Sequence, residues 1–454
     1  MKNKLFIAIL SASFITSFSA SAINVALPII GKELKLSPPL LSWLSTLYLL
    51  SNVFFLLPLG KIADIYGRKK LFSVGLIVFS LGSIVSIFSF DYEVLIFSRV
   101  IQGFGGSVLF ATTPALVTSI SLPQERGKNL GFYVTSVYLG LSLGPLLGGV
   151  LTQYFTWRSI FVFTLFLGII SLILNSFVKE EWRESQEEKF DLLGSLLYAF
   201  SVTSILYGFS RLKDKWGPIF ILLGIIGIIL FYLVESRREK PMFPVKFLSK
   251  NRRFVFSNLS ALINYGATSA LSFLLSLYLQ NIKGISPNVA GFLLTFQPLA
   301  QVIFSPWAGR LSDRKDPGKI ASLGMLIISL VMFFLSFLRH DSPLYVIPLS
   351  GFILGFGFSL FSSPNTNAIM GSVDKSFYGI ASSTLATMRV MGQTFSMAIV
   401  NSGFSIFLKE TKTLEGSSDF MYAFKFLLYI FTLLCLLGVW ASLQRNKKIE
   451  KRTF

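Results

Sequence analysis

Two arginines lie inside long apolar stretches of the chain, where a positive charge is unusual. Arg99 lies near one end of the stretch 94–120, and Arg389 lies near the middle of 377–407. A guanidinium at membrane depth costs about 2.5–3.5 kcal/mol on insertion scales, so such a residue is expected to face a protein interior or a wet cavity. Arg99 could alternatively reach the nearer membrane surface. Both residues are therefore candidate intramembrane charges, and each could serve either function or packing.

Proton-coupled transport needs a side chain that gains and loses a proton inside the membrane, usually Asp, Glu or His. The 22 acidic residues all fall in connections, tails or the ends of apolar stretches, and the single His lies in a polar connection. Their absence from the centres of the stretches counts against proton coupling. A cationic substrate would also lack its natural partner. A neutral or amphiphilic substrate, or an anion held by Arg389, fits the sequence better.

Other kinds of chemistry find little support in the sequence. One Cys (Cys435) and one His (His340) exclude a metal site built from several His or Cys ligands. The sequence contains no recognisable pairing of a nucleophile with a base and no Walker-type phosphate loop. We therefore expect no enzyme, no metal, no cofactor and no ATP-driven pump.

The composition indicates the elements that must position these residues. Of the 454 residues, 53% are hydrophobic and only 14% are charged, with a mean hydropathy of +0.67. Soluble proteins carry roughly a quarter of charged residues, and a run of about twenty apolar residues can cross a bilayer. The sequence thus predicts an all-α polytopic membrane protein with about 14 transmembrane helices. The expected spans are 5–30, 38–59, 71–90, 94–120, 128–153, 157–178, 191–211, 216–235, 253–280, 286–308, 319–338, 343–370, 377–407 and 421–443.

The placement of basic residues predicts the orientation of the chain. With both termini on the cytoplasmic side, most of the 41 Lys and Arg residues lie in cytoplasmic segments, as the positive-inside rule requires. The densest clusters are 61–70, 237–253 and 445–452. These clusters suit anionic lipid, so the net charge of +19 does not indicate nucleic-acid binding. We expect a multi-pass protein of the cell membrane with the lipid bilayer as its surroundings.

A repeated loop divides the chain into related halves. The loop after the second span has Gly60, Asp64, Gly67 and Arg68, and the loop after the tenth has Gly309 and Asp313 in matching positions. Such a repeat predicts a six-helix bundle in 1–178, a two-helix insert with cytoplasmic linkers in 179–250, and a second six-helix bundle in 251–454. Glycines would allow a tight turn and close helix approach, and Asp64 could cap a helix or pair with Arg68. We expect these loops to gate the protein.

The fifth span carries small residues at a regular spacing. Gly140, Gly144 and Gly148 share one helix face, which lets a neighbouring helix pack backbone to backbone. Pro145 removes one backbone donor and permits a bend. The same face could be a static interface or the seam along which two half-bundles move.

Three motifs together resemble the major facilitator superfamily. The loop from Gly60 to Arg68 resembles its signature loop, and Arg99 with Gln102 and Gly103 resembles its second motif. The fifth span, with Gly140, Gly144, Pro145, Gly148 and Gly149, resembles the antiporter motif of its drug-exporting branches. The count of spans resembles the fourteen-helix drug:proton antiporter family. This resemblance implies alternating access, a small-molecule substrate and a monomer. The family pattern has an acidic residue about five positions before Asn24, where this sequence has Ser19.

Polar amides on the presumed interior spans suggest a polar central cavity for the substrate. They are Asn24, Asn52, Asn264, Gln297, Gln301, Asn365 and Gln393. Each of them alone is more often a helix-to-helix hydrogen bond than a ligand contact.

Three functions remain open at this point. The first is a secondary-active transporter that exports small amphiphilic or drug-like molecules by alternating access, as in multidrug resistance. The second is a facilitator or exchanger of organic anions centred on Arg389. The third, a membrane sensor or scaffold that transports nothing, lacks support because the chain leaves no room for a soluble output domain.

Overall fold

The computed structural model describes residues 2–35, 38–183, 190–210, 215–238, 249–285, 287–407 and 418–445. Within these ranges the regular elements are helices and none is a strand. The predicted all-α class is therefore confirmed. The expected linkers of the two-helix insert lie partly outside the described residues.

The helices group into two compact units. Unit 1 comprises Met1–Val245 together with Val373–Thr387, and unit 2 comprises Lys246–Ser372 together with Met388–Phe454. The two expected insert helices therefore pack as part of unit 1. The helix α16 (Tyr378–Phe407) begins among the residues of unit 1 and continues among those of unit 2.

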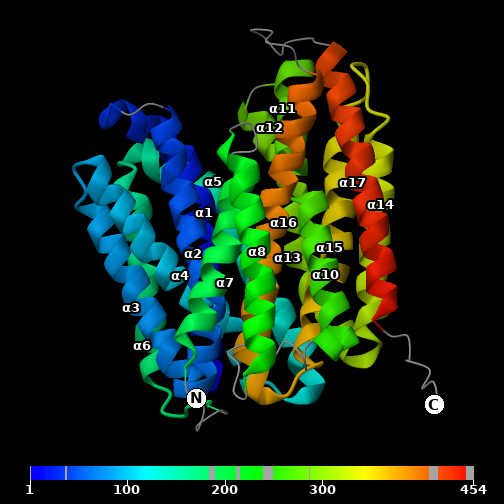
Figure 1. Ribbon diagram of the computed structural model, residues 1–454. Helices are drawn as coiled ribbons and strands as arrows, with labels where there is room; N and C mark the ends of the chain where they lie inside the picture. The colour runs from blue at the N-terminus through cyan, green and yellow to red at the C-terminus, as the bar shows by residue number, and fades with distance from the viewer. Residues whose placement is uncertain are drawn as a thin grey trace, which may run out of the picture. The chain divides into compact units, whose positions relative to one another are not determined.

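The long helices described in unit 1, besides the start of α16, are labelled α1 to α8 (Figure 1). They are α1 (Lys2–Glu33), α2 (Pro38–Tyr66), α3 (Arg68–Ile87), α4 (Tyr92–Ile120), α5 (Arg126–Tyr154), α6 (Arg158–Ser176), α7 (Leu192–Ser210) and α8 (Trp216–Arg237). A short 3₁₀ turn, Pro123–Glu125, precedes α5. α1 packs against α5 and α6, and α4 packs against α2 and α3. α7 packs against α8 and reaches the rest of the unit through α2.

Unit 2 contains most of α16 and the other described helices from α10 onward. They are α10 (Arg252–Thr268), α11 (Leu271–Leu277), a π-helical turn (Tyr278–Ile282), α12 (Pro287–Leu294), α13 (Phe296–Arg314), α14 (Pro317–Leu335), α15 (Val346–Met370) and α17 (Ser418–Gln444). A 3₁₀ turn, Lys375–Phe377, leads into α16.

The two units repeat the same pattern of helix pairs. In unit 1, α4 packs against α2 and α3, and α6 packs against α1 and α3. In unit 2, α15 packs against α13 and α14, and α17 packs against α10 and α14. The order of these helices along the chain is the same in both units. Each unit thus has the internal arrangement expected of one half of a duplicated bundle.

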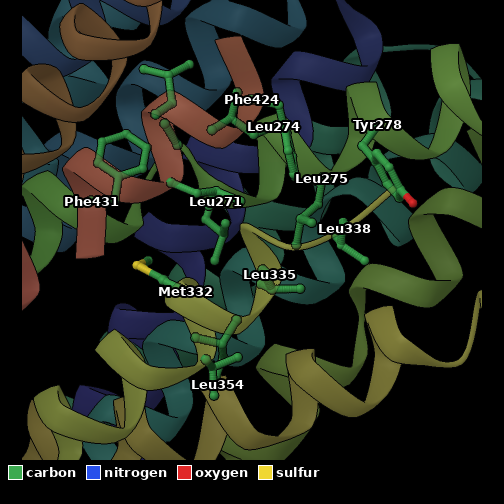
Figure 2. Close-up of a cluster of buried hydrophobic side chains, with 14 of the residues drawn as sticks. Leu271, Leu274, Leu275, Tyr278, Met332, Leu335, Leu338, Leu354, Phe424 and Phe431 are labelled. Carbon is green, nitrogen blue, oxygen red and sulfur yellow. The ribbon is translucent and has the colours of Figure 1, made fainter. Parts of the chain in front are cut away.

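Among the described residues, the largest apolar cluster lies in unit 2. It joins α11, α14, α15 and α17, and Figure 2 shows ten of its side chains labelled. Leu274 and Leu335 are fully buried within it, and Tyr278 stacks on Phe424 with ring centroids 5.5 Å apart. Leucine, methionine and aromatic side chains fill this region. The cluster fixes the short helix α11 against three long ones.

Thirteen of the described helical segments are long and apolar enough to span a membrane. The fourteenth expected span corresponds to α16, which is 30 residues long but falls short in hydropathy because it carries Arg389, Gln393 and several Ser and Thr residues. A helix of this length is sufficient to cross the hydrocarbon core. The polar side chains of α16 indicate that it lies among other helices and not against lipid.

Two of the expected spans are found, at Arg252–Gln280 and Val289–Arg314, but the helix within each is interrupted. The span 253–280 divides after Thr268, whose hydroxyl donates to the carbonyl of Asn264 (2.7 Å), and the amide of Ala270 donates to the hydroxyl of Ser396 (3.0 Å). The span 286–308 divides at Thr295, whose hydroxyl donates to the carbonyl of Phe292 (2.6 Å). At the first break, the amide of Ala270 thus bonds a side chain of α16 in place of a carbonyl of its own helix.

Candidate functional site

The first repeated segment is mostly helix, not the loop predicted from the sequence. Gly60 and Asp64 lie in the last turns of α2, and α3 begins at Arg68. Gly67 alone makes the turn, with φ of +114°, a conformation that side chains rarely adopt. In the second repeat, Gly309 and Asp313 likewise lie within α13. Apolar residues between the polar ones, such as Ile62 and Ala63, continue the helical packing beyond the predicted end.

Asp64 is fully buried and holds the start of α16. Its carboxylate accepts hydrogen bonds from the backbone amides of Gly379 (3.0 Å to each oxygen) and Ile380 (3.3 Å). These amides belong to the first turn of the helix, where a negative charge is favoured by the exposed N–H groups. Gly60 completes the contact, because a Cβ on it would lie 2.6 Å from the carbonyl oxygen of Gly379. The two backbones therefore touch at glycines.

Arg68 surrounds the same carboxylate from the other side. Its Nε donates to Asp64 Oδ1 (2.9 Å), Nη2 lies 2.8 Å from the same oxygen, and Nη1 donates to the hydroxyl of Ser119 (2.8 Å). Nη2 also donates to the carbonyl of Lys375, just before α16. The guanidinium, which has no exposed surface, thus ties the ends of α2 and α4 to the segment leading into α16.

Two residues of this site were missed by the sequence analysis. Glu181 accepts from the backbone amides of Lys69 (2.9 Å) and Lys70 (3.0 Å) and so covers the amino terminus of α3. Gly379 supplies the close approach described above. The only signal for Gly379 was a glycine at the start of a helix, and Glu181 lay in a cluster of charges that gave no reason to single it out.

The second repeat forms a weaker version of the site. Asp313 is half-buried, and its Oδ1 accepts from Nδ2 of Asn367 on α15 (3.4 Å). Asn367 also donates to the hydroxyl of Ser312 (2.9 Å). The helix that follows, α14, is capped by Asp316, which accepts from the amides of Gly318 (2.7 Å) and Lys319 (3.2 Å). In unit 1 the corresponding helix α3 is capped by Glu181 instead. Asp313 therefore occupies the position in unit 2 that Asp64 occupies in unit 1, but it is less buried.

Arg99 lies at the junction of α1, α2 and α4 with no exposed surface, so it does not extend to the membrane surface. Its Nε donates to the carbonyl of Leu44 (3.2 Å), and its Nη1 donates to the hydroxyl of Ser19 (3.2 Å) and to Oε1 of Gln102 (2.6 Å). The ring of Tyr48 lies beside the guanidinium, 4.4 Å from centroid to Cζ. Ser19, at the place where the family pattern has an acid, is thus the α1 side chain in contact with Arg99.

The contacts of Arg99 extend into a chain of buried polar side chains. Nε2 of Gln102 donates to the hydroxyl of Ser83 on α3 (2.9 Å), which lies 3.2 Å from the hydroxyl of Thr164 on α6. The chain therefore joins α1, α4, α3 and α6 through one network. Gly103 lets α4 approach α2, since a Cβ there would lie 2.6 Å from the carbonyl oxygen of Tyr48.

The glycines of α5 pack against α1. A Cβ on Gly140 would lie 2.9 Å from the amide of Phe18, one on Gly144 3.1 Å from the amide of Ala22, and one on Gly148 3.0 Å from the carbonyl oxygen of Ala22. Gly149 is different, because a Cβ there would meet only Val25 at an ordinary 3.7 Å. α5 continues as a helix through Pro145, which is exposed. The predicted backbone-to-backbone packing of the first three glycines is therefore observed.

Arg389 lies in unit 2 and is half-buried. Its guanidinium carbon lies 5.3 Å from the ring centroid of Tyr265 on α10, a distance typical of a cation–π contact. Gln393, one turn further along α16, is also half-buried. Gly392 allows α16 to approach α10, since a Cβ there would lie 2.6 Å from the carbonyl oxygen of Leu262.

The other amides proposed for a cavity differ in their surroundings. Asn52 Oδ1, both amide atoms of Asn264 and Oε1 of Gln301 are buried and have no hydrogen-bond partner among the described residues. Gln297 is half-buried, and Asn24 is exposed and accepts from Ser45 (2.9 Å). Asn365 instead accepts from Arg445 (3.0 Å) and donates to the carbonyl of Ser257 (3.2 Å), which is a helix-to-helix contact. Unit 1 and unit 2 thus each contain buried amides with hydrogen-bonding capacity to spare.

Some helix-end acids are buried, which the sequence did not indicate. Asp191, just before α7, is 5% exposed and pairs with Arg238, and Glu235 near the end of α8 is 1% exposed. Both have an oxygen close to the position of a Cβ on Gly194. Even so, each described acidic residue lies in a connection or near a helix end, as predicted, and none lies near the centre of a spanning helix.

These features together define a multi-pass membrane protein built from two duplicated helix bundles with buried charges, which is the architecture of a secondary transporter. Residues 9–255 and 257–453 match the sequence profile of the Major Facilitator Superfamily. The chain belongs to this superfamily of transporters.

Several named relatives are transporters as well. The riboflavin transporter RibZ of Clostridioides difficile (strain 630) is 32% identical over 461 residues, covering 99% of both chains. The multidrug resistance protein Stp of Mycobacterium tuberculosis (strain ATCC 25618 / H37Rv) is 28% identical over 88% of this chain and 75% of its own. The crystal structure of the human organic anion transporter MFSD10 (TETRAN) has the same fold, with a TM-score of 0.67, 14% identity and coverage of 95% of this chain and 99% of that one.

Proposed function

We propose that the protein exports small amphiphilic molecules across the cell membrane by alternating access. The observation that carries this proposal is the bonding of Asp64 and Arg68 to the start of α16, a helix whose later residues group with unit 2. A network of this kind can hold one conformation until transport breaks it. Gly60, Gly67 and Gly379 would allow the close contact to form and separate.

The kind of substrate follows from the charges near the helix centres. Among the described residues, no carboxylate lies near the middle of a span, so a cationic drug would find no fixed partner there. The unsatisfied amides of Asn52, Asn264 and Gln301 instead suit a neutral molecule with hydrogen-bonding groups. Relatives named as multidrug resistance proteins support export. We propose further that a proton gradient does not drive transport.

An accumulation experiment tests export. Cells that express the protein or its Asp64→Asn variant would be loaded with a panel of neutral, cationic and anionic fluorescent amphiphiles. We expect lower accumulation of neutral compounds with the unaltered protein than with the variant, and no change when a protonophore is added. Equal accumulation of every compound at equal expression would refute the proposal, and selective export of cations would refute the substrate class.

A second candidate is transport of riboflavin. The observation that favours it is the similarity to RibZ, which extends over nearly the whole of both chains. Riboflavin is uncharged at neutral pH and combines an aromatic ring system with a polar tail, so it belongs to the class of substrate that the buried amides favour. We propose it as the first individual compound to test.

Growth distinguishes this candidate from general export. A riboflavin-requiring strain would express the protein or the Asp64→Asn variant at limiting external riboflavin. Restored growth with the unaltered protein alone would support riboflavin uptake. Failure to restore growth, combined with lower accumulation of other amphiphiles, would support the exporter instead.

The organic-anion alternative depends on Arg389. A thermal-shift screen of purified protein against organic anions and lipophilic cations, repeated with Arg389→Ala, separates it from the first proposal. A ligand at about 100 times its Kd stabilises the folded state by about 2.7 kcal/mol, which is measurable. Stabilisation by an anion that disappears in the variant would favour the alternative.

We also propose that both termini face the cytoplasm and that the protein acts as a monomer. The basic clusters support this orientation through the positive-inside rule. Membership of the superfamily supports a monomer, since each chain contains both halves of the duplicated bundle.

A further inference from the structure

Arg99 is enclosed by unit 1, yet one of its nitrogens lacks a hydrogen-bond partner among the described residues. The side chain has no exposed surface, and Nη2 is buried without a partner. The other nitrogens, Nε and Nη1, donate to Leu44, Ser19 and Gln102. A guanidinium has five N–H groups, of which two are on Nη2. These two donors are therefore held in place with nothing in the described part of the chain to receive them.

The charge of Arg99 is also unbalanced by its surroundings. Its partners are a backbone carbonyl, a hydroxyl, a side-chain amide and the ring of Tyr48, all of which are neutral. The ion pairs found among the described residues do not include Arg99. Arg68, by comparison, is equally buried but lies against Asp64. Buried charges in proteins are normally paired, whereas Arg99 has no acidic partner among the described residues.

The surrounding contacts fix the direction of the guanidinium. Gln102 donates to Ser83, which orients its carbonyl oxygen toward Arg99, and Leu44 holds Nε from α2. A planar guanidinium fixed at two nitrogens presents the third in one direction. The site is thus rigid before any ligand arrives, which lowers the entropy cost of binding.

We propose that Arg99 binds a small anion at Nη2, at the junction of α1, α2 and α4. The ligand is a compact negative centre, supplied by a free halide or by the carboxylate of an organic molecule. Charge-assisted hydrogen bonds from Nη2 recognise it, and the negative charge balances the buried guanidinium. This inference does not depend on the direction of transport or on the substrates proposed above.

Ser19 provides a matched pair of variants. Its hydroxyl lies 3.2 Å from Nη1, so Ser19→Asp places a carboxylate beside the guanidinium. The built-in charge then replaces the bound anion. Ser19→Asn has the same shape without the charge and serves as the control. Arg99→Gln removes the charge that attracts the anion.

The test is the unfolding temperature of purified protein as a function of anion concentration at constant ionic strength. Sodium HEPES keeps the ionic strength constant and is the reference salt in both arms, so each response is measured relative to it. Bromide or chloride forms one arm, and acetate or benzoate forms the other. We expect a saturable rise of several degrees for unaltered protein and Ser19→Asn in at least one arm, and no such rise for Ser19→Asp or Arg99→Gln. The arm that responds identifies the source of the anion.

The position of the anion is tested separately by the anomalous signal of bromide in crystals of the unaltered protein, or of a bromine-labelled benzoate if only carboxylates stabilise. A peak beside Nη2 supports the proposal. A flat response of the unaltered protein in both arms, an equal response in Arg99→Gln, or a peak only at other places would overturn it. Both the anion-dependent unfolding temperature and the anomalous signal are measured on the unaltered protein, so they test the proposal even if a variant fails to fold.

Discussion

The carboxylate of Asp64 lies 2.8 Å from Nη2 of Arg68, although α2 ends and α3 begins between these two residues. Gly67 turns the chain so that the first residue of α3 points back at the last turns of α2. Neither side chain is exposed. The pair therefore has low dielectric surroundings, where losing one partner leaves the other charge unbalanced.

Replacing Asp64 by Asn should reduce transport strongly and lower stability by about 3 kcal/mol. The variant removes the charge that faces Arg68, and breaking a buried pair typically costs about 3–5 kcal/mol. The measurements are transport rate at equal expression and unfolding temperature in detergent. The matched control is Asp313→Asn, which affects a half-buried carboxylate in the corresponding position of unit 2 and should cost less. Equal effects of the two variants would contradict this account.

Adding a methyl group to Gly140 should be far more harmful than adding one to Gly149. A Cβ on Gly140 would lie 2.9 Å from both the amide nitrogen of Phe18 and Cβ of Ser17, and backbone cannot move aside easily. Overpacking of this kind costs about 1–3 kcal/mol. Gly149→Ala meets only Val25, so its unfolding temperature should stay close to that of the unaltered protein. An equal fall in unfolding temperature for Gly140→Ala and Gly149→Ala would show that close packing of α1 on α5 does not determine the effect.

The stability contributed by Glu33 should disappear at low pH. Burial tends to raise the pKa of Glu33, but hydrogen bonds from Arg158 (2.7 Å) and Trp157 (2.7 Å) and the charge of Arg158 together lower it. A lowered folded-state pKa means that this stability is present above the unfolded pKa, about 4.3, and is lost as the pH falls through the folded value. The carboxylate is 43% exposed, so solvent screening limits the effect to about 0.5 kcal/mol.

Comparing the unaltered protein with Glu33→Gln tests this dependence. The difference in unfolding temperature between them should be present at pH 6 and should shrink progressively below about pH 4. A difference that stays constant with pH would mean that packing, not charge, is responsible. Glu125→Gln is a suitable control, because Glu125 lies 3.8 Å from Lys128 at an exposed position.

Cysteine labelling should reveal the proposed orientation. Cys435 is the single cysteine of the chain and is buried in α17, so Cys435→Ala provides a cysteine-free background. Tyr66 at the end of α2 is 57% exposed, and Phe90 between α3 and α4 is 79% exposed. A membrane-impermeant maleimide should label Phe90→Cys in intact cells, but Tyr66→Cys only after permeabilisation. The opposite pattern would reverse the proposed topology.

The sequence alone determined the class of protein, the approximate spans and the superfamily. Apolar runs long enough to cross a bilayer are local properties, so most span positions agree with the helices found. The helix breaks after Thr268 and at Thr295 were not predicted, and at the first of them the amide of Ala270 bonds the hydroxyl of Ser396, 126 positions away in the chain. The hydropathy of α16 was likewise ambiguous, since polar side chains are tolerated only when other helices enclose them.

Tertiary structure decided what the charged residues contact. The sequence placed Arg99 and Asp64 in motifs, but Arg99 meets Ser19 across 80 positions of chain, and Asp64 meets Gly379 across 315. Contacts at such separations depend on how helices pack, which no local pattern records. The burial of Asp191 and Glu235 near helix ends has the same origin. The sequence by itself therefore determines which charged residues lie in or near the spanning helices. Helix packing determines which of them have a partner of opposite charge.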